Sequence, residues 1–409
     1  MVVKDEEKEA KREKQNEKMR RYCWRVRHFH FIKKKKIVFS QFGGNGYGCN
    51  PKAIADEILR RGLDWDLVWL LKRGTDPAKA GIPAGIRPIV ADEESRNSLY
   101  ELETARVWIN NIHFQALIER GLVKRKGTVY INTFHGGISF KSQGNDRPNY
   151  AAKMKRMSRK VQNQLKDCEM VDYILSSSDF MTHPLQEFFH GHGEIMRIGD
   201  ARNDIIIRGS EELRKKVRDF YGLAPETKIL LYAPTFRDNG KTDCFDLDYE
   251  RILSALEEQD GCHWVAFARM HPNLRKKAKK LIPQSDRILD ASAYLDMQEL
   301  VVASDIMVTD YSSSIADFML SRKPGFMYAK DLDKYVETRG LNFALEDLPF
   351  PIARNNDEMV ENILNFSQKD YEEHVQRFID QTGYIDDGKA SERIVDFLET
   401  IIEPGKHRV

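Results

Sequence analysis

Cysteine is scarce in this chain of 409 residues, and the few cysteines are not arranged for cross-linking. The five cysteines are an odd number, stand far apart, and include no Cys-x-x-Cys pair. Disulfide frameworks of secreted proteins and structural zinc sites need paired or clustered cysteines. We therefore expect reduced thiols in a cytoplasmic protein.

Long hydrophobic runs are also missing. No apolar stretch approaches the roughly 18–20 residues that a membrane-spanning helix needs, although 41% of the residues are hydrophobic. The first residues do not resemble a secretory signal, because no apolar segment follows their charges. The sequence predicts a protein that stays in the cytoplasm and has enough apolar residues for two buried cores.

Spacings typical of metal and dinucleotide sites are absent as well. The Asp-x-Asp pairs at Asp246 and Asp331 lie in polar segments, and no cluster of His, Cys and Asp has metal-ligand spacing. We expect no metal and no cofactor. The glycines between Gly43 and Gly48 follow a predicted strand, but their spacing is not G-x-G-x-x-G. A nicotinamide or flavin site is not indicated; a tight turn and a loop on the acceptor side of a cleft remain as interpretations.

Positive charge is concentrated near the N-terminus. Residues 1–36 hold 14 Lys and Arg against 6 Asp and Glu, a net charge of +8, whereas the whole chain has only +2. Tyr22, Trp24, Phe29 and Phe31 are mixed with the later basic residues. This mixture suits an anionic membrane surface; a solvated tail and a nucleic-acid arm are the alternatives. We expect a basic helical leader on a membrane surface and no nucleic-acid partner.

Strand and helix patterns alternate along the rest of the chain, which predicts parallel sheets covered by helices on both faces. The predicted strands are 37–42, 66–71, 86–90, 105–111, 128–134, 173–176, 228–233, 264–269, 305–309 and 325–328. The alternation restarts after the connector at 197–204. We therefore predict an α/β protein with two doubly wound, Rossmann-like domains that face a central cleft, an acceptor-side domain at 37–204 and a donor-binding domain at 205–380. Residues 381–409 are expected to form a helix that packs back on the first domain. A long polar helix is predicted over 150–168.

Four polar motifs directly follow predicted strands. They are Thr133-Phe134-His135-Gly136-Gly137, Tyr232–Asp238, Arg269-Met270-His271-Pro272 and Thr309–Ser314. Ligands of doubly wound sheets lie at the carboxyl ends of the strands. Imidazoles there can accept a proton from a hydroxyl, and Arg, His and helix starts can bind phosphate. Taken singly, each motif is explained equally well by an ordinary turn or N-cap.

In this order, the four motifs closely resemble the CDP-glycerol glycerophosphotransferase family of teichoic-acid synthesis. The run continues into Tyr328–Tyr335 and Arg339-Gly340, and the likeness covers roughly Ile37–Phe378. The resemblance implies a GT-B-type fold and transfer of glycerol phosphate, or ribitol phosphate, from a CDP-alcohol to a membrane lipid-linked acceptor, with release of CMP. It further implies a peripheral enzyme of teichoic-acid or capsule synthesis on the inner face of the cell membrane.

The resemblance also implies the site residues. His135 corresponds to the family's proposed catalytic base, and His271 to a second catalytic histidine at the donor pyrophosphate. The implied donor-binding residues are Gly136, Gly137, Ile138, Ser139, Arg202, Pro234, Thr235, Arg269, Met270, Ser312, Ser313 and Asp317. A GT-B site needs no metal where Arg, His and helix N-termini take up the charge of the leaving group.

Two positions depart from the family pattern. In the connector, Ala201 stands where the family tends to have proline. The family usually has His-Gly-Thr where this chain has His135-Gly136-Gly137, so one hydroxyl that can contact the donor is missing. The alternative functions are another GT-B nucleotide-sugar glycosyltransferase or epimerase, and a membrane scaffold without catalysis.

Overall fold

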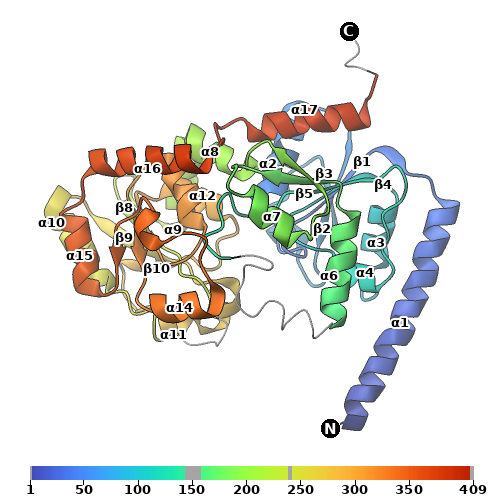
Figure 1. The fold of residues 1–409 in the computed structure, drawn as a ribbon, viewed down its shortest axis with the longest axis horizontal. Coiled ribbons are helices and arrows are strands. Elements are labelled where there is room, and N and C mark those ends of the chain that lie inside the picture. The colour runs from blue at the N-terminus through green and yellow to red at the C-terminus, as the bar shows by residue number, and fades with distance from the viewer. Residues whose placement is uncertain (1, 143–157, 238–241, 406–409) are drawn as a thin grey trace.

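The structure is a computed structural model that describes residues 2–142, 158–237 and 242–405 as two α/β domains side by side (Figure 1). The N-terminal sheet contains β1 Lys33–Ser40, β2 Asp66–Leu71, β3 Ile86–Val90, β4 Ala105–Asn110, β5 Val129–Asn132, β6 Tyr173–Ser176 and β7 Glu194–Arg197. The C-terminal sheet contains β8 Lys228–Tyr232, β9 Trp264–Ala268, β10 Ile288–Asp290, β11 Ile306–Thr309, β12 Gly325–Tyr328 and β13 Ile352–Ala353.

The helices connect and cover these strands. In the N-terminal half they are α1 Val2–Phe29, α2 Cys49–Arg60, η1 Pro77–Lys79, α3 Arg96–Glu103, α4 Gln115–Glu119, α6 Arg159–Met170, α7 Thr182–Phe188, η3 Ala201–Asn203 and α8 Asp204–Arg208. In the C-terminal half they are α9 Glu211–Tyr221, α10 Tyr249–Asp260, η4 Pro272–Lys277, α11 Ala278–Leu281, α12 Met297–Ala303, α13 Ser314–Phe318, η5 Met319–Ser321, α14 Leu332–Arg339, η6 Leu345–Asp347, α15 Asn356–Leu364, α16 Gln368–Thr382 and α17 Ala390–Ile402.

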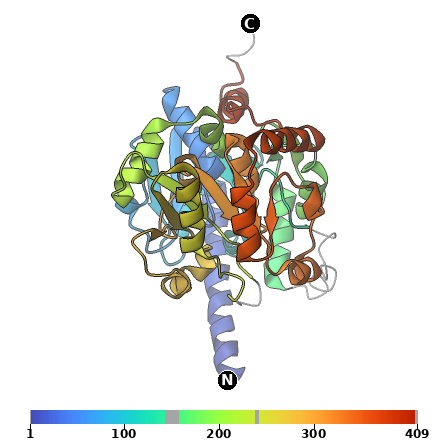
Figure 2. The ribbon, with the colours of Figure 1, turned by 90° about the vertical axis from the view of Figure 1, so that its left-hand side faces the viewer.

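Both sheets are doubly wound and, among the described strands, parallel throughout. Their strand orders are β3-β2-β1-β4-β5-β6-β7 and β10-β9-β8-β11-β12-β13. Figure 2 looks onto the C-terminal domain and shows helices on both sides of its sheet. In each sheet the strand order reverses between the first and fourth strands, which are β1 and β4 in one sheet and β8 and β11 in the other. Doubly wound sheets bind ligands at this point, outside the carboxyl ends of the strands.

Burial explains which of the observed strands could be predicted from the sequence. The interior strand β9 is buried along its whole length, as expected for a strand covered by helices on both faces. The three strands that the sequence pattern missed, β7, β10 and β13, are short and all lie at sheet edges. An edge strand pairs on one side only and needs no continuous apolar run.

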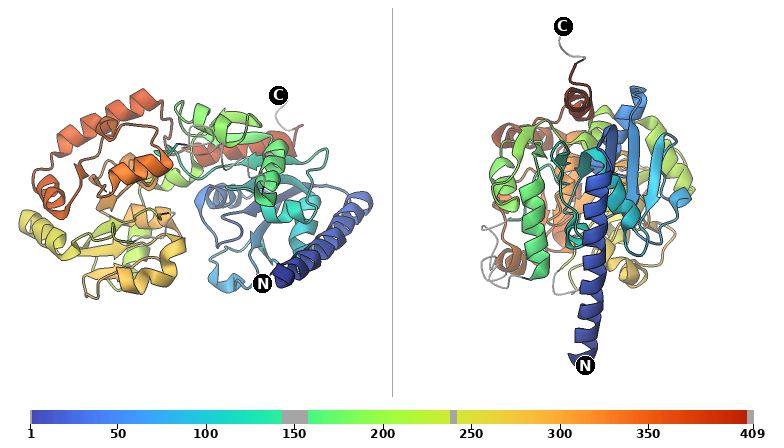
Figure 3. Two further views of the ribbon diagram at one scale, coloured as in Figure 1. Left: turned by 60° about the horizontal axis from the view of Figure 1, so that its bottom comes forward. Right: turned by 90° about the vertical axis from the view of Figure 1, so that its right-hand side faces the viewer.

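The N-terminal leader is helical, but its second half belongs to the N-terminal domain. Met19, Cys23 and Val26 of α1 are buried, and Arg27 pairs with the buried carboxylate of Glu103. The first strand begins at Lys33, inside the predicted leader of residues 1–36. Figure 3 shows α1 along the outer side of the N-terminal domain, away from the C-terminal domain, with its first turns projecting beyond it.

The C-terminal chain crosses from one domain to the other. Helix α16 lies over the C-terminal domain and α17 over the N-terminal domain (Figure 1), where α17 packs against α2. Asp204 fixes the start of α17, because its carboxylate accepts bonds from the backbone N–H groups of Ala390 and Ser391 at 2.9 and 2.8 Å. These are helix-terminal donors that have no partner within the helix.

One predicted helix falls partly outside the described residues. Helix α6 begins at Arg159, with Ser158 as its N-cap, and ends at Met170. The predicted start of this helix, over 150–157, lies outside the described residues.

Candidate active site

The turn that follows β5 presents His135 at the carboxyl end of the N-terminal sheet. Phe134 has a left-handed backbone, with φ of 50°, and its N–H donates to Asn132 Oδ1 at 2.9 Å. A left-handed conformation is uncommon for a bulky residue and marks a strained, specifically held turn. The imidazole packs between the rings of Phe134 and Phe42, whose centroids lie 4.8 and 5.3 Å away.

The tautomer of His135 follows from a hydrogen bond to the backbone. Its Nδ1 lies 3.0 Å from the backbone carbonyl oxygen of Asn111. A carbonyl can only accept, so Nδ1 carries the hydrogen and the Nε2 of the neutral ring keeps its lone pair. Burial is the main cause that lowers the His135 pKa to about 4. The ring is therefore neutral at pH 7, with Nε2 available as a base.

His271 stands at the carboxyl end of β9 in the opposite domain and has the reverse arrangement. Its Nδ1 accepts from the backbone N–H of Asn273 at 3.2 Å, so in the neutral ring Nε2 carries the hydrogen. The ring stacks on Phe236 at 5.8 Å and is more exposed than that of His135. Partial burial, the largest of several causes, lowers the pKa of His271.

The turn that carries His135 faces the C-terminal domain. A β-carbon built at Gly136 would lie 3.2 Å from the Oγ of Ser313, which stands between β11 and α13. The strand-end turns after β5 and β11 therefore face each other where the two domains meet.

Arg202 and Asp317 form a buried ion pair where the domains join. Their closest atoms, Arg202 Nη2 and Asp317 Oδ1, are 2.9 Å apart, and Asn203 Nδ2 also donates to this carboxylate. Burial raises the Asp317 pKa to about 6, although Arg202 opposes that shift. Among the described residues Arg202 Nε has no hydrogen-bond partner. In this structure the predicted donor-binding arginine connects η3 to α13.

Several other predicted donor residues are held within the protein. Arg269 Nη1 donates to the carbonyl oxygens of Ala291 and Tyr294 at 3.0 and 2.8 Å. The side chains of Ile138 and Met270 are 0% and 2% exposed and belong to hydrophobic cores. These two side chains therefore do not line open space, so a contact with a donor would come from their backbone, and their donor role stays a prediction.

The remaining predicted residues lie at the strand ends of the two domains. The Thr235 backbone N–H donates to Asp310 Oδ1 at 2.9 Å, and within the described part of the chain its buried Oγ1 has no partner. The Ser312 hydroxyl lies 2.8 Å from that of Ser314, which begins α13. Pro234 is buried beside Thr235, and Ser139 Oγ donates to the Lys141 carbonyl oxygen at 2.8 Å.

A family model described as CDP-Glycerol:Poly(glycerophosphate) glycerophosphotransferase matches residues 22–400. The chain belongs to this family. That confirms the resemblance carried by the motifs. The match spans both strand-end turns that carry His135 and His271.

Curated relatives of this chain include polymerases and a primase. A teichoic acid poly(glycerol phosphate) polymerase of Staphylococcus epidermidis is 29% identical over 91% of this chain and 51% of its own length. A teichoic acid glycerol-phosphate transferase of Staphylococcus aureus is 28% identical over 88% and 92%. A teichoic acid ribitol-phosphate primase of Bacillus spizizenii is 31% identical over 75% and 78%. The chain spans about half the length of two poly(glycerol phosphate) polymerases, that of Staphylococcus epidermidis and that of Bacillus subtilis.

Solved structures confirm the predicted GT-B-type, two-domain α/β fold. The wall teichoic acid polymerase TagF, in a variant with CDPG, has a TM-score of 0.76 and 27% identity, and covers 91% of this chain and 90% of that chain. A putative UDP-N-acetylglucosamine 2-epimerase from Listeria monocytogenes has 14% identity and a TM-score of 0.53, with 91% and 98% covered. The epimerase likeness shows the fold alone.

Gly137, where this chain departs from the family's His-Gly-Thr, packs against Tyr384. A β-carbon at position 137 would overlap the Tyr384 hydroxyl and lie 2.9 Å from the Cζ of that ring. Tyr384 stands in the crossing between α16 and α17 and pairs with Ser178 through a β-bridge. The space that a threonine side chain would need is therefore filled from a segment almost 250 positions later. No sequence spacing points to this contact.

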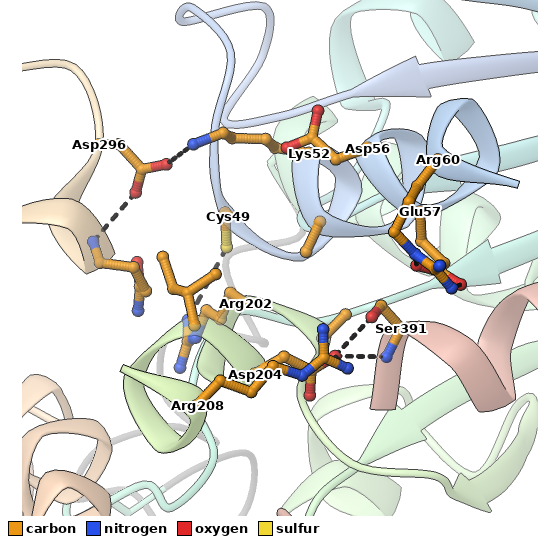
Figure 4. Close-up of a pocket in the computed structure, with 14 residues that line it drawn as sticks. Cys49, Lys52, Asp56, Glu57, Arg60, Arg202, Asp204, Arg208, Asp296 and Ser391 are labelled. Carbon is orange, nitrogen blue, oxygen red and sulfur yellow. Dashed lines mark hydrogen bonds and ion pairs between the residues drawn. The ribbon is translucent and has the colours of Figure 1, made fainter. Parts of the chain in front are cut away.

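A cavity of about 160 Å³ lies beside this junction, and Figure 4 shows its lining. Lys52 from α2 reaches across to Asp296, the N-cap of α12, with an Nζ–Oδ2 distance of 2.5 Å. Arg202 and Asp204 border the opposite wall. A larger cavity of about 360 Å³ lies in the C-terminal domain next to Phe236 and Arg339.

The glycine loop after β1 is explained by packing. A β-carbon at Gly44 would lie 2.8 Å from the carbonyl carbon of Leu71, and the Lys72 N–H donates to the Gly44 oxygen at 3.0 Å. Only glycine permits this approach of two backbones. The loop also faces the other domain, since Leu295 lies 3.8 Å from a β-carbon built at Gly46.

Among the described residues there is neither a metal-binding cluster nor a membrane-spanning helix. Within residues 2–142, 158–237 and 242–405, no group of three or more His, Cys, Asp and Glu side chains is arranged to hold a metal ion. Within the same ranges, every helix is too short or too polar to cross a bilayer.

Proposed function

We propose that this protein transfers glycerol phosphate, or a related polyol phosphate, from a CDP-alcohol to a lipid-linked acceptor of teichoic-acid or capsule synthesis, and releases CMP. The observation that carries the proposal is the pair of strand-end histidines with opposite tautomers, one in each domain. One presents a lone pair at Nε2 and the other an N–H at Nε2. Membership of the family and the names of its relatives support the same activity.

The proposed step is a direct displacement at phosphorus. The acceptor hydroxyl gives its proton to His135 Nε2 while its oxygen bonds to the β-phosphorus of the donor. The bond from this phosphorus to the bridging oxygen breaks, and CMP leaves with the electron pair. The His271 Nε2–H donates to the diphosphate and stabilises the growing negative charge. Such a reaction depends on positioning and electrostatics more than on covalent chemistry by the protein.

A bound donor would improve His135 as a base. In the free protein its low pKa keeps the ring neutral but makes it only weakly basic. A diphosphate brings negative charge beside the ring and favours the protonated form, which raises the pKa toward neutrality. The base thus gains strength only when the donor is in place. Contacts of the donor with Gly136, Thr235, Ser312 and Ser313 are part of this proposal.

The experiment that tests the function compares donors. The full chain is incubated with CDP-glycerol, CDP-ribitol or a UDP-sugar and with a lipid-linked disaccharide in vesicles. We expect CMP release with one CDP-alcohol, and a mass increase of the acceptor by whole polyol-phosphate units. Product length separates single addition from polymerisation. Turnover of the UDP-sugar without CMP release from either CDP-alcohol would favour the sugar-transferase or epimerase alternative.

We also propose that the protein works as a peripheral protein on the cytoplasmic face of the membrane, with the end of α1 as its contact. Trp24, Phe29 and Phe31 are 52%, 74% and 92% exposed, and Lys33–Lys35 beside them are exposed too. Aromatic rings at headgroup depth and cations on lipid phosphates are a common mode of such binding. Lys36 does not contribute, because it is buried and paired with Glu101.

Sedimentation with vesicles tests the membrane contact. We expect binding to vesicles with anionic lipid and little binding to neutral vesicles. Substitution of Trp24, Phe29 and Phe31 by alanine should abolish it. Phe220→Ala is the matched control, since Phe220 is 67% exposed but lies in the C-terminal domain. Equal binding of the triple variant and the wild type would contradict this contact.

A further inference from the structure

Asn50 is a fully buried asparagine that joins three segments of the N-terminal domain. It lies in the first turn of α2 and is 0% exposed. Its Nδ2 donates to the backbone carbonyl oxygen of Thr133 at 3.1 Å and to Asp200 Oδ1 at 2.8 Å, and its Oδ1 accepts from the backbone N–H of Arg202 at 2.9 Å. A carbonyl oxygen can only accept and an N–H can only donate, so these bonds fix the orientation of the amide. Asn50 thus connects α2, the turn after β5 and the connector that contains η3.

The bond to Thr133 fixes the peptide unit that leads into the turn of His135. This unit contains the carbonyl oxygen of Thr133 and the N–H of Phe134. Asn50 holds the oxygen, and Asn132 Oδ1 accepts from the N–H at 2.9 Å. Phe134 itself has a left-handed backbone, a conformation that persists only where its surroundings over-determine it. Two asparagine side chains therefore set the direction in which the chain enters the turn, and with it the place of the imidazole.

The connector that bonds to Asn50 is held by other parts of the molecule. Arg202, whose N–H donates to Asn50, pairs through Nη2 with Asp317 of the C-terminal domain at 2.9 Å. The backbone N–H of Asp200 donates at 2.7 Å to Asp386 Oδ1, which lies in the crossing between α16 and α17. The position of the connector therefore depends on how the two domains and the crossing segment pack together.

A buried amide with several bonds specifies geometry more than it adds stability. An apolar side chain of similar size would fill the same space without the cost of burying polar atoms. A polar network whose members are bonded instead selects one arrangement of the segments that it joins. The arrangement selected at Asn50 is that of the His135 turn relative to the connector.

We propose that Asn50 is a positioning residue for the transfer reaction, which holds the peptide between Thr133 and Phe134 so that His135 Nε2 points at the acceptor hydroxyl. This inference rests on the proposed function. Asn50 does not touch the substrate in this proposal and acts through His135. Because Arg202 pairs with the C-terminal domain, the same amide ties the aim of the base to the seating of the two domains.

An exchange of the residues at positions 50 and 200 tests the bond to the turn. In the double variant Asn50→Asp/Asp200→Asn, the carboxylate at position 50 can accept from the Arg202 N–H and from the amide at position 200, and the net charge is unchanged. The Thr133 oxygen loses its donor. We expect kcat for CMP release to fall by about a hundredfold, the effect of a misplacement of about 1 Å. Calorimetric titration should show nearly wild-type affinity for the accepted CDP-alcohol, because His135 acts on the acceptor hydroxyl.

Asn362 supplies the matched control. Its Nδ2 donates at 2.9 Å to the carbonyl oxygen of Ile352, a strand residue of the C-terminal domain. Asn362→Ala therefore also removes an amide bond to a strand carbonyl, but far along the chain from the turn of His135. It should release CMP at the wild-type rate.

A double-mutant cycle separates positioning from general support of the fold. If Asn50 acts through His135, the exchange should have little further effect on the residual CMP release of His135→Ala. Losses that multiply would show that Asn50 acts independently of the base, and would overturn the proposal. Thermal melts set the assay temperature below unfolding for every variant. If the exchanged protein is not folded there, Asn50→Ser takes its place in the same cycle.

The two levels of inference fail differently. If the wild type releases CMP from neither CDP-alcohol, the proposed function and the role of Asn50 are both wrong. If the wild type releases CMP and the folded exchange variant does so at the same rate, only the role of Asn50 is wrong.

Discussion

Each of the two domains presents a histidine after a strand, but they hold it in opposite ways. His135 packs against two phenylalanine rings and is anchored through Nδ1–H to a backbone carbonyl of its own domain. His271 is more exposed, stacks on one ring, and accepts a backbone N–H at Nδ1. One domain thus offers a lone pair at Nε2, and the other offers a hydrogen.

This difference shows that the hydrogen-bond partner of Nδ1 sets the chemical role that Nε2 of a histidine can have. Both residues are histidines at the end of a parallel strand, and their sequence contexts do not distinguish a base from a hydrogen-bond donor. The partner of Nδ1 decides which nitrogen carries the proton. Each partner is a backbone group, so a side-chain substitution elsewhere does not easily exchange the two roles.

The largest effect is expected from removing the base. His135→Ala should reduce the rate of CMP release by about a thousandfold, the range typical of general-base catalysis. Donor affinity should change much less, because His135 acts on the acceptor hydroxyl. Titration of the variant with CDP-alcohol and a thermal melt are the controls. Turnover within tenfold of the wild type would exclude His135 as the base.

A smaller effect is expected in the other domain, and its chemistry should differ. His271→Ala should lower kcat by about ten- to a hundredfold, because one hydrogen bond to the leaving charge is lost. His271→Gln keeps an N–H near the Nε2 position and should retain more activity than the alanine variant. His135→Gln should be as inactive as His135→Ala, because an amide is no base. Equal losses in the two His271 variants would contradict the donor role.

Gly137→Ala probes the support of the turn that carries His135. The new methyl group overlaps Tyr384, and overpacking of this kind costs about 1–3 kcal/mol of unfolding free energy. Urea denaturation measures the change. Combination with Tyr384→Phe removes the nearest atom and should recover part of the loss. A variant as stable as the wild type would show that the crossing segment does not press on the catalytic turn.

The finest test of the comparison is the pH dependence. The acid limb of kcat/KM, which reports the free protein, should lie below pH 6.5, because burial lowers the His135 pKa to about 4. The limb of kcat should lie at higher pH, by about one unit, because the bound diphosphate raises that pKa. The free energy of unfolding should also fall as the pH drops from 6.5 to 4. In this range the His135 imidazole is protonated in the unfolded chain but stays neutral in the folded protein. Circular dichroism over the same range separates unfolding from titration, and a kcat limb at lower pH would refute the argument.

The sequence by itself was enough to predict the interior strands of both sheets. Strands such as β2, β6 and β12 were predicted with their exact bounds, because a strand covered on both faces must be an uninterrupted apolar run. The edge strands β7, β10 and β13 carry no such signal. The histidine motifs were also visible, since strand-end positions follow directly from strand positions.

Only the tertiary structure decided what these residues touch. Nothing near Gly137 in the sequence indicates that Tyr384 fills its space, and nothing in the Arg202 connector indicates an ion pair with Asp317 across the junction. The tautomers of His135 and His271 depend on backbone groups that sequence patterns do not locate. Local periodicity determines which elements form, whereas contacts between distant segments, and the proton positions that follow from them, exist only once both domains have packed.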